Sequence, residues 1–336
     1  MLSLERLALD EVEWKRLDAL DDRVLFQTRE WLAFVAESQG AEPVVAVLRE
    51  RGVERGWFTG LMSSRFGVRV LGAPLPGWST QYMGFNLLPG TSRAAAFGAL
   101  LPFAFGELRC AHLEVCDRWA GLPDLAGLGA QHEDVRTYVV DLRPGLEEIR
   151  AAMTSGTRQN MRKAGRVGLV VEDAEPHGFA AEYYSQLQDV FAKQRLVPTY
   201  PLRRVEALIE HLYPTGRLQL IRVRTPEGTS IATALVAGVG RNAYFWGGAS
   251  WREHQHLRPN ELLFWHAFTT WKERGAEEFD FGGGGDYKRK YGATELVVPH
   301  GRLSRWRVLS HLREAVKRSV AARQQAAGAF QSRARV

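Results

Sequence analysis

The chain has 336 residues, which is long enough for two domains with their own cores or for one large domain. Its composition, 45% hydrophobic and 24% charged with no long biased tract, is that of an ordinary folded protein and excludes a low-complexity chain. No apolar run approaches the roughly 18 residues of a membrane span. The first twenty residues carry charges at short intervals, which is not typical of a secretory signal, so we expect a cytoplasmic protein.

The net charge of +6 is concentrated at the C-terminus. Residues 302–336 contain nine Lys or Arg and one acid, Glu314, so residues 1–301 carry a net charge of −2. The pattern in this segment predicts a basic amphipathic helix, whose apolar positions are Leu309, Leu312, Val316 and Val320. Such a helix most often packs on the body of the protein, and an anionic membrane surface or an RNA backbone are the alternatives.

Both cysteines fall in a predicted strand, RCAHLEVCD, at Cys110 and Cys116. In an extended strand they lie roughly 20 Å apart, whereas a disulfide requires Cα atoms within about 7 Å. His112 shares their face but cannot complete a tetrahedral zinc site across that distance. We therefore expect two buried thiols in a reducing compartment, with no metal and no permanently bound cofactor.

The first half of the chain predicts the order helix, strands, helix, strand, strand. The opening helix over 24–37 has Thr28 as a candidate N-cap and Trp31, Phe34 and Val35 on its apolar side. Residues 72–85 form a loop in which Trp78 and Tyr82 are expected to be exposed, as a candidate pocket wall. The other predicted elements are strands over 43–50, 55–64, 66–72, 108–116 and 134–142 and a helix over 91–108, kinked near Pro102.

The second half predicts a short helix, a basic helix, a strand, two helices, three antiparallel strands, a helix and a last strand. The helix that begins at Pro259 ends at Gly275, in agreement with the usual start and stop residues. The predicted ranges of the other elements are 146–153 and 157–166 for the first helices, 168–173 for the strand, 175–196 and 201–212 for the next helices, 217–250 for the three strands and 277–281 for the last strand.

The basic helix carries a row of arginines on one face, because Arg158, Arg162 and Arg166 recur every four residues with Lys163 beside them. No acid occurs between Met153 and Val171 to neutralise them. The row is either a solvated face or an anion site for the phosphates of a nucleotide-linked or RNA-linked substrate.

The segment EEFDFGGGGDYKRKYG, residues 277–292, joins a short strand to four consecutive glycines, Gly282–Gly285. Glycine weakens a strand, so the run indicates that another backbone or a ligand approaches the main chain closely. Three cations follow, framed by Tyr287 and Tyr291. The segment is either a flexible hairpin with solvated lysines or the edge of a substrate site, where a cation neutralises an oxyanion or a phosphate.

Together with YFWGGAS (244–250), LRPNELLFWHAFTTWKERG (257–275) and TRQNMRKAGRVGLVVED (157–173), this segment resembles the FemAB-like branch of the GNAT-fold acyltransferases. That branch includes aminoacyl-tRNA-dependent enzymes that add residues to peptidoglycan stem peptides, and the BioF2-like acetyltransferase domains. The resemblance covers roughly residues 26–305 and is strongest after Asp141.

The resemblance implies an α+β fold of two tandem GNAT-like domains, with mixed, mostly antiparallel sheets flanked by helices. We expect an N-terminal domain over 1–142, a second domain over 143–301 that carries the main site, and a basic helix over 302–336 that packs back on the first domain. The order three strands, helix, strand in the second half is that of the GNAT core.

The resemblance also implies transfer of an acyl or aminoacyl group to an amine of a cell-envelope precursor or a small-molecule acceptor. Lys288 matches the lysine of the family's aromatic-Lys box and is expected at the acyl-transfer centre. Asp280 and Asp286 flank the glycines and can orient the amine or take its proton. The candidate substrate-binding residues are Arg158, Arg162, Lys163, Trp246, Ser250, Tyr287 and Tyr291.

The acyl donor is left open between aminoacyl-tRNA and acyl-CoA. The glycine-rich pyrophosphate loop of acetyl-CoA-dependent GNAT enzymes is missing, because LRPNELLF occupies its place. A BioF2-like acyl-CoA enzyme is one alternative, and an inactive GNAT scaffold that binds RNA or membrane is another. We expect no DNA partner and a location in the cytoplasm or at the inner face of the membrane. No G-x-S-x-G, H-E-x-x-H, P-loop or Rossmann glycine motif is present.

Overall fold

The structure is a computed structural model that describes residues 1–65, 67–75, 77, 79–193 and 195–305. It divides into two units, one formed by residues 1–136 with 296–305 and one by residues 137–295. The chain thus leaves unit 1 within strand β7 (Gln131–Asp141) rather than at residue 142, and it returns to unit 1 before residue 301. The predicted helix over 302–336 lies, beyond residue 305, outside the described residues.

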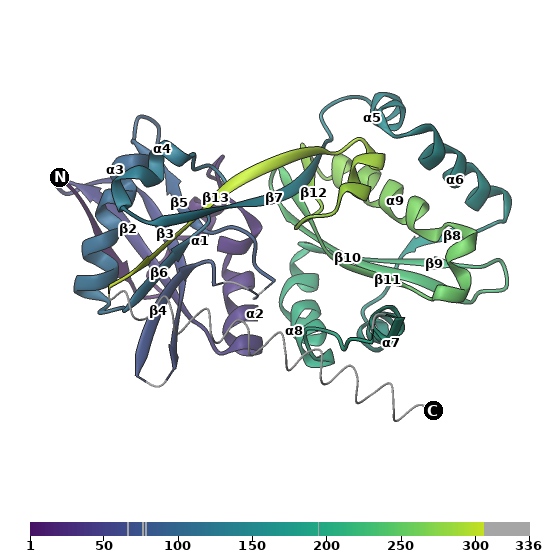
Figure 1. Ribbon diagram of the computed structural model, residues 1–336, viewed down its shortest axis with the longest axis horizontal. Helices are drawn as coiled ribbons and strands as arrows, with labels where there is room; N and C mark the ends of the chain where they lie inside the picture. Colours follow the sequence, from purple (N-terminus) through teal and green to yellow (C-terminus); the bar gives the residue numbers. More distant parts are fainter. Residues whose placement is uncertain (66, 76, 78, 194, 306–336) are drawn as a thin grey trace. The chain divides into compact units, whose positions relative to one another are not determined.

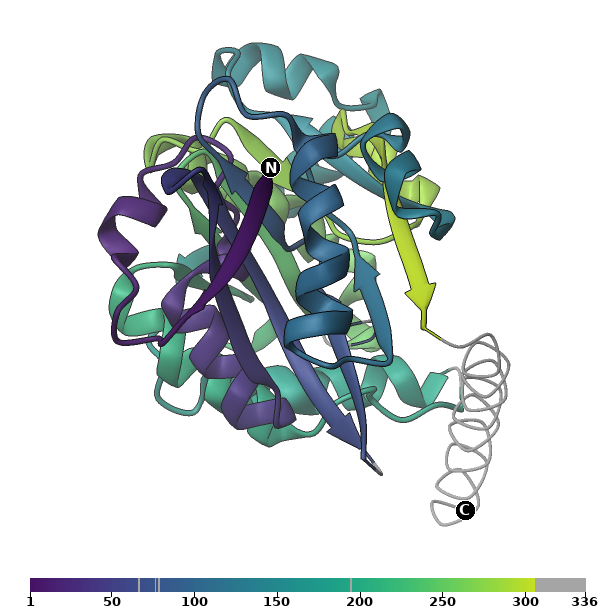
Figure 2. The same cartoon turned by 90° about the vertical axis from the view of Figure 1, so that its left-hand side faces the viewer.

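Unit 1 is built on a mixed sheet whose strands run in the order β1-β2-β3-β4-β6-β13, with β5 paired to β3. All neighbouring pairs are antiparallel except β4 and β6. Helix α3 lies along β1 (Figures 1 and 2). The elements are β1 (Leu2–Leu7), α1 (Trp14–Asp18), η1 (Leu25–Gln27), α2 (Arg29–Gln39), β2 (Glu42–Glu50), β3 (Val53–Arg65), β4 (Val68–Ala73), β5 (Gly84–Leu87), α3 (Arg93–Leu101), the π-helical turn η2 (Pro102–Glu107), β6 (His112–Val115), α4 (Leu122–Leu125), η3 (Ala126–Leu128), the first part of β7, and β13 (Thr294–Ser304).

Three expectations for unit 1 need correction. The helix predicted over 24–37 is a short 3-10 turn followed by α2, because Thr28 between them is extended and its hydroxyl accepts a hydrogen bond from the N–H of Trp31, as a true N-cap does. The strand predicted over 108–116 is confined to β6. Tyr82, expected to be exposed, is 1% exposed and packs edge-on against Phe26, and Trp78 lies outside the described residues.

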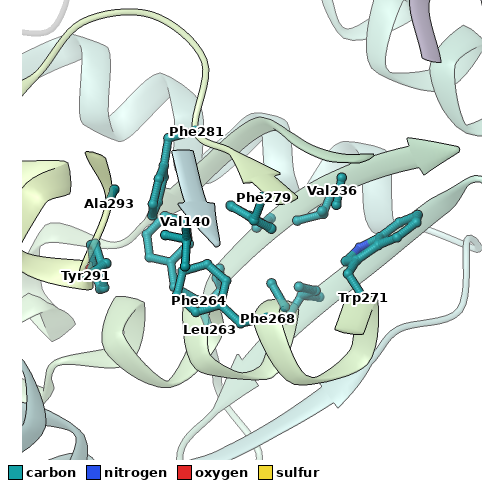
Figure 3. Packing of buried hydrophobic residues seen from close by; sticks show 14 of the residues in the cluster. Val140, Val236, Leu263, Phe264, Phe268, Trp271, Phe279, Phe281, Tyr291 and Ala293 are labelled. Atoms are coloured by element: carbon teal, nitrogen blue, oxygen red, sulfur yellow. The ribbon is translucent and has the colours of Figure 1, made fainter. Parts of the chain in front are cut away.

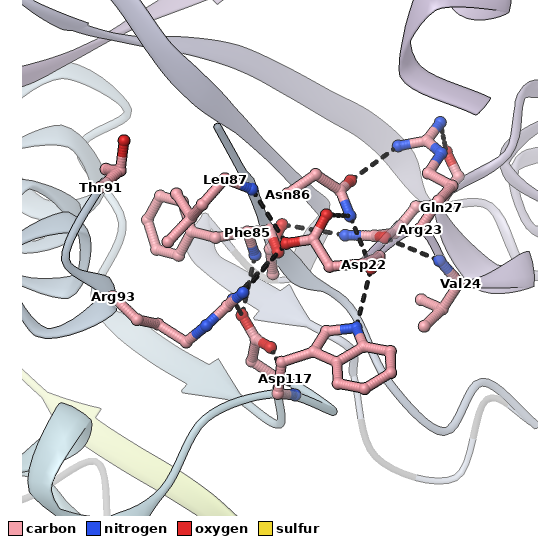
Figure 4. Close-up of polar contacts among 12 residues, drawn as sticks. Asp22, Arg23, Val24, Gln27, Phe85, Asn86, Leu87, Thr91, Arg93 and Asp117 are labelled. Carbon is pink, nitrogen blue, oxygen red and sulfur yellow. Dashed lines mark hydrogen bonds and ion pairs between the residues drawn. The ribbon is translucent and has the colours of Figure 1, made fainter. Parts of the chain in front are cut away.

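A buried polar network holds β5 in place (Figure 4). Asp117 accepts hydrogen bonds from the N–H of Phe85 (2.9 Å) and from Arg93 (2.6 Å). Asp22 accepts from the N–H of Leu87 (2.9 Å) and from the same Arg93 (3.0 Å). Burial raises the pKa of Asp117, and the charge of Arg93 opposes this shift. Because these groups are satisfied by one another, we interpret the network as a structural clamp rather than as a ligand site.

Unit 2 contains strands paired in the order β7-β12-β11-β10-β9-β8, in which only β11 and β12 run parallel. Helices α7 and α8 lie on one face, and α9 with α5 and α6 lies on the other (Figure 1). The elements are α5 (Leu146–Ala152), α6 (Ser155–Arg166), β8 (Val170–Asp173), α7 (Phe179–Lys193), α8 (Leu202–Leu212), η4 (Tyr213–Thr215), β9 (Leu218–Arg224), β10 (Ser230–Val239), β11 (Asn242–Ser250), η5 (Arg252–Leu257), α9 (Pro259–Glu273), β12 (Glu278–Asp280) and η6 (Asp286–Tyr291). The predicted α+β class with mostly antiparallel sheets is confirmed.

Aromatic side chains from α9 and from the last strand of unit 2 form the centre of its core (Figure 3). Phe264 and Phe268 stand one helical turn apart on the buried stripe of α9. Phe264 packs edge-on against Phe281 at 5.0 Å, and Phe268 packs edge-on against Phe279 at 4.8 Å between ring centroids. Tyr291 stacks on Phe281 at 5.5 Å. This packing fixes the chain on both sides of the glycine loop (Gly282–Gly285), since Phe281 precedes the loop and Tyr291 follows it.

Candidate acyl-transfer site

The strands of unit 2 separate between β11 and β12, its parallel pair. β12 pairs with β11 only from Asn242 to Tyr244, opposite Glu278 to Asp280. The rest of β11, residues 245–250, pairs with β10 on its other side, and no described strand pairs with it on the β12 side. The main-chain N–H and C=O groups that face this side therefore have no strand partner within the described residues. Backbone groups require hydrogen-bond partners, so a ligand can bind to them.

A β-bulge lies in the middle of this open segment. Gly247 is paired with Leu235 and Phe245 with Val236, so Trp246 is an extra residue on β11. A bulge bends its strand and redirects side chains, and bulges are frequent beside active sites. The half-buried indole of Trp246 lies 5.0 Å from the ring of Tyr200. Trp246 therefore lies at the opening and is also part of an aromatic cluster.

Two tyrosines behind the bulge were not predicted as site residues. The hydroxyl groups of Tyr183 and Tyr200 are 2.7 Å apart. The hydroxyl of Tyr183 lies so close to Gly247 that a Cβ added there would come within 2.4 Å of it. Burial raises the pKa of Tyr200 to about 12 and the pKa of Tyr183 well above its usual value, so both phenols keep their protons at neutral pH. No pattern in the sequence indicates this pair, because one residue lies within a helix and the other in the following turn.

Lys288 stabilises the glycine loop through hydrogen bonds to its main chain. Its ammonium group donates hydrogen bonds to the carbonyl oxygens of Phe281 (3.4 Å), Gly282 and Gly283 (3.0 Å). The side chain is 4% exposed, and burial lowers its pKa while the charge of Asp280 opposes this shift. An ammonium has three protons, so all of them are directed at the loop in this arrangement. The alternative of a hairpin with a solvated lysine at position 288 is wrong.

The two candidate carboxylates have different environments. Asp280 is 3% exposed, and its Oδ1 accepts hydrogen bonds from the hydroxyl of Thr137 and from the N–H of Gly282 (2.8 Å). Asp286 has a side chain that is 89% exposed, and it accepts a hydrogen bond of 2.5 Å from the hydroxyl of Tyr138. That hydrogen bond raises the pKa of Tyr138. Asp280 thus fixes the start of the loop, whereas Asp286 presents a carboxylate to solvent beside a phenol.

The remaining predicted pocket residues are dispersed. Tyr287 is 58% exposed, next to the glycine loop, whereas Tyr291 is 1% exposed in the aromatic core. Ser250 is 3% exposed at the end of β11, where its hydroxyl lies 3.5 Å from the side-chain amide of Gln255. Of these three, Tyr287 alone presents its ring to solvent beside the loop.

The basic row on α6 is divided between two roles. Thr154 caps the helix by accepting a hydrogen bond from the N–H of Thr157. Arg158 turns back and donates to the carbonyl oxygens of Ala151 (2.8 Å) and Met153. Lys163 donates to the carbonyl oxygen of His256, in the turn before α9 (3.1 Å). The other two arginines belong to an open hollow of about 530 Å³, lined by Gln159, Arg162, Gly165 and Arg166.

A buried carboxylate that the sequence analysis did not single out joins the helices to the glycine segment. Glu261, in the first turn of α9, is 4% exposed and accepts hydrogen bonds from Asn160 (3.3 Å) and Lys290 (3.0 Å). The carbonyl oxygen of Lys290 in turn accepts from the N–H of Thr154 (2.9 Å). α6, α9 and η6 are therefore held together as one assembly around the opening.

Within the described residues, no group of three or more His, Cys, Asp or Glu side chains is arranged to hold a metal ion. In the same part of the chain, we find no helix with the length and apolar character needed to cross a membrane.

The family described as the acetyltransferase (GNAT) domain matches residues 151–290, which include the open strand, α9 and most of the glycine segment. A sequence search of curated proteins found no match. Among solved structures, one described as FemX has a TM-score of 0.69 at 14% identity, over 88% of this chain and 96% of that one.

Two further structures have the same fold at low identity. L-PGS from Bacillus licheniformis has a TM-score of 0.53 at 11% identity, over 87% of this chain and 96% of that one. A tandem GNAT protein from the clavulanic acid biosynthesis pathway has a TM-score of 0.52 at 12% identity, over 90% of this chain and 98% of that one. These likenesses concern the fold. The protein is therefore a transferase with a GNAT acetyltransferase domain over residues 151–290, and it shares its fold with the structure described as FemX.

Proposed function

We propose that this transferase moves an acyl or aminoacyl group from a nucleotide-linked donor to an amine at the opening between β11 and the glycine loop. The observation that carries the proposal is the unpaired edge of β11 over residues 245–250, which faces the side where β12 has ended. An extended chain with amide groups can add to such an edge through main-chain hydrogen bonds. An acyl thioester with an amide-containing arm satisfies this requirement. An aminoacyl ester has no amide group, so with that donor the amides would come from a peptide acceptor.

The glycine loop, together with Lys288 behind it, is the part of the site that can stabilise negative charge. As the amine attacks the donor carbonyl, negative charge develops on the carbonyl oxygen, and preorganised N–H groups or cations stabilise it. The positive charge of Lys288 lies directly behind Gly282 and Gly283, and Asp280 fixes the first N–H of the loop. Both are thus positioning residues in our proposal, because neither presents a free donor to the substrate.

Asp286 is our candidate for the group that removes the proton from the amine. It is the exposed carboxylate of the two, and the hydroxyl of Tyr138 orients one of its oxygen atoms. A general base requires a free oxygen within hydrogen-bond reach of the attacking nitrogen. Tyr287, Trp246 and Ser250 are assigned to the walls around the substrates, and Arg158 and Lys163 to holding the shape of α6.

For the acceptor we favour an amine of a cell-envelope precursor. The sequence resembles a branch that includes enzymes acting on peptidoglycan stem peptides, and the structures described as FemX and L-PGS have the same fold. A BioF2-like reaction, in which acyl-CoA is the donor and a small molecule the acceptor, is the second candidate, and the GNAT domain match favours it.

The basic residues of segment 302–336 fit a peripheral contact with an anionic membrane from the cytoplasmic side. Sedimentation with vesicles tests this part of the proposal: protein lacking residues 306–336 should lose binding to anionic vesicles and keep its transferase activity. Equal binding with and without the segment would contradict the contact.

The test of the function is a transfer assay with two donors, charged tRNA and acetyl-CoA, offered separately with peptidoglycan precursors and simple amines. Mass spectrometry should reveal an amide product with one of the donors. The inactive-scaffold alternative predicts no product with any combination, and that result would overturn the proposal.

A further inference from the structure

The exposed part of α6 carries cations without acidic partners. Arg162 and Arg166 are exposed, and no acid of the described chain forms an ion pair with either of them. Arg158 and Lys163, by contrast, are hydrogen-bonded to carbonyl oxygens within unit 2. The two arginines are one helical turn apart, so their Cβ atoms lie about 5–6 Å from each other, and their guanidinium groups can contact one phosphate or two adjacent ones.

The position of α6 is informative because α6 packs against the segment that replaces the glycine-rich loop. Lys163 contacts the carbonyl oxygen of His256 just before α9, and Asn160 contacts Glu261 in the first turn of α9. A helix N-terminus ordinarily attracts phosphate. Here the first turn of α9 already contains the buried carboxylate of Glu261, which disfavours a second anion at that end.

Both arginines line an open hollow of about 530 Å³, and Gln159 and Gly165 complete its lining. Gly165 leaves it open, because a Cβ at that position would have no other atom within 4 Å. The volume is in the range of small-ligand sites, and the lining combines planar guanidinium groups, which recognise phosphate through paired hydrogen bonds, with an amide.

We propose that the α6 hollow, formed by Gln159, Arg162, Gly165 and Arg166, binds the phosphate groups of the nucleotide part of the acyl donor. In this chain the hollow takes the place of the phosphate-binding site that a glycine-rich loop before α9 would provide. The inference rests on the proposed function, in that the ligand is a nucleotide-linked donor. The shared chemistry is a nucleotide phosphate, which coenzyme A and RNA both present.

The experiment measures the affinity of the full-length protein for coenzyme A and for an RNA hairpin at increasing salt concentration. In the variant R162Q/R166Q, the affinity for the nucleotide that the parent binds should fall about tenfold at low salt, and for RNA the slope of log affinity against log salt should decrease by about 2. The matched control R203Q/R241Q removes the same charge from arginines that are already paired with Glu210 (2.9 Å) and Glu277 (2.8 Å), and it should bind like the parent.

A second pair of variants distinguishes loss of nucleotide binding from loss of structure. G165E introduces a carboxylate into the hollow at an open helical position and should weaken nucleotide binding as strongly as R162Q/R166Q does. G165A introduces only a methyl group and should bind like the parent. The site assignment is overturned if the parent binds neither coenzyme A nor RNA, or if R162Q/R166Q and G165E keep the parent affinity. It is also overturned if the arginine dependence appears only with anionic phospholipid vesicles.

The transfer assay separates this inference from the proposed function. If the parent forms an amide product and R162Q/R166Q keeps its nucleotide affinity, the hollow is not the phosphate site and the function stands. If nucleotide binding depends on the arginines and no product forms with any acceptor, the site stands and the function fails.

Discussion

Lys288 is the residue on which the glycine loop depends most directly. Replacing it with Met keeps a similar volume but removes the donor from three carbonyl oxygens. We expect K288M to lose about a hundredfold in kcat/KM, because the loop N–H groups that face the oxyanion are no longer held in place, and about 1–3 kcal/mol in the free energy of unfolding. Steady-state kinetics and urea denaturation measure the two effects.

A cation far from the glycine loop in the sequence serves as the control. Arg203 is exposed on α8, and its ion pair with Glu210 is at the surface, so R203M should keep most of the kcat/KM and of the free energy of unfolding. A K288M protein with the turnover of the parent would remove Lys288 from the account.

The two aspartates should separate chemistry from stability. D286N should lower the turnover without changing the free energy of unfolding, because the side chain is exposed and an amide oxygen can still accept the hydrogen bond from Tyr138. D280N should destabilise the protein by about 1–3 kcal/mol, because it disturbs a buried acceptor of two hydrogen bonds. Unfolding curves and steady-state kinetics on both proteins measure the two effects. A D286N protein with the turnover of the parent would exclude Asp286 as the base.

At this scale the sequence indicates a candidate segment but not the directions of its side chains. It indicated Lys288 and the flanking aspartates, yet alternation within DYKRKY cannot show that Lys288 and Tyr291 face inward while Tyr287 faces outward. That direction is set by the 3-10 turn and by the packing of Tyr291 on Phe281. Tyr183 and Tyr200 were not found because their pairing depends on how α7 packs on the bulge.

At the scale of elements, the fit of α7 against β11 depends on the absence of a side chain at Gly247. G247A places a methyl group 2.4 Å from the hydroxyl of Tyr183, so either the helix or the bulge must shift. We expect a loss of about 1–3 kcal/mol in the free energy of unfolding, as for other overpacked sites. In G165A the added methyl group meets nothing, so that variant should be neutral or more stable by about 0.5–1 kcal/mol. Equal stability of the two variants in urea would contradict the close contact.

Elements with strong periodicity were predicted well, and those that depend on tertiary context were not. The apolar stripe of α9 and the alternation of β9, β10 and β11 are visible in the sequence. The break before α2 was missed because VLFQT continues the helical pattern although Thr28 is extended. A return of the C-terminal segment to the first domain was expected, but not that strand β13 makes it from residue 296, since strand pairing at long sequence separation leaves no local signal.

For the molecule as a whole, the buried thiols predict how stability depends on alkaline pH. Burial raises the pKa of Cys110 to about 11 and the pKa of Cys116 to about 12, from an ordinary value of 9.0. Above pH 9 the unfolded chain loses these protons while the folded protein retains them, so stability falls as pH rises. By pH 10 the loss is about 1 kcal/mol per cysteine.

Urea denaturation at pH 8 and pH 10 tests this prediction. The parent should lose more stability between the two pH values than C110A/C116A does. If both proteins show the same decrease, the thiols are not the groups responsible. The buried tyrosines, such as Tyr200 with a pKa raised to about 12, contribute equally to both proteins, so the difference between the two proteins is due to the thiols.

The central claim is that acyl transfer takes place at the open edge of β11, and hydrogen exchange with mass spectrometry tests it most directly. When the donor that supports transfer is added, amides of residues 245–250 and of the glycine loop should exchange more slowly, while the turn at residues 226–228 should be unchanged. If the donor binds and is turned over while exchange at residues 245–250 stays as fast as in the free protein, the reaction takes place elsewhere.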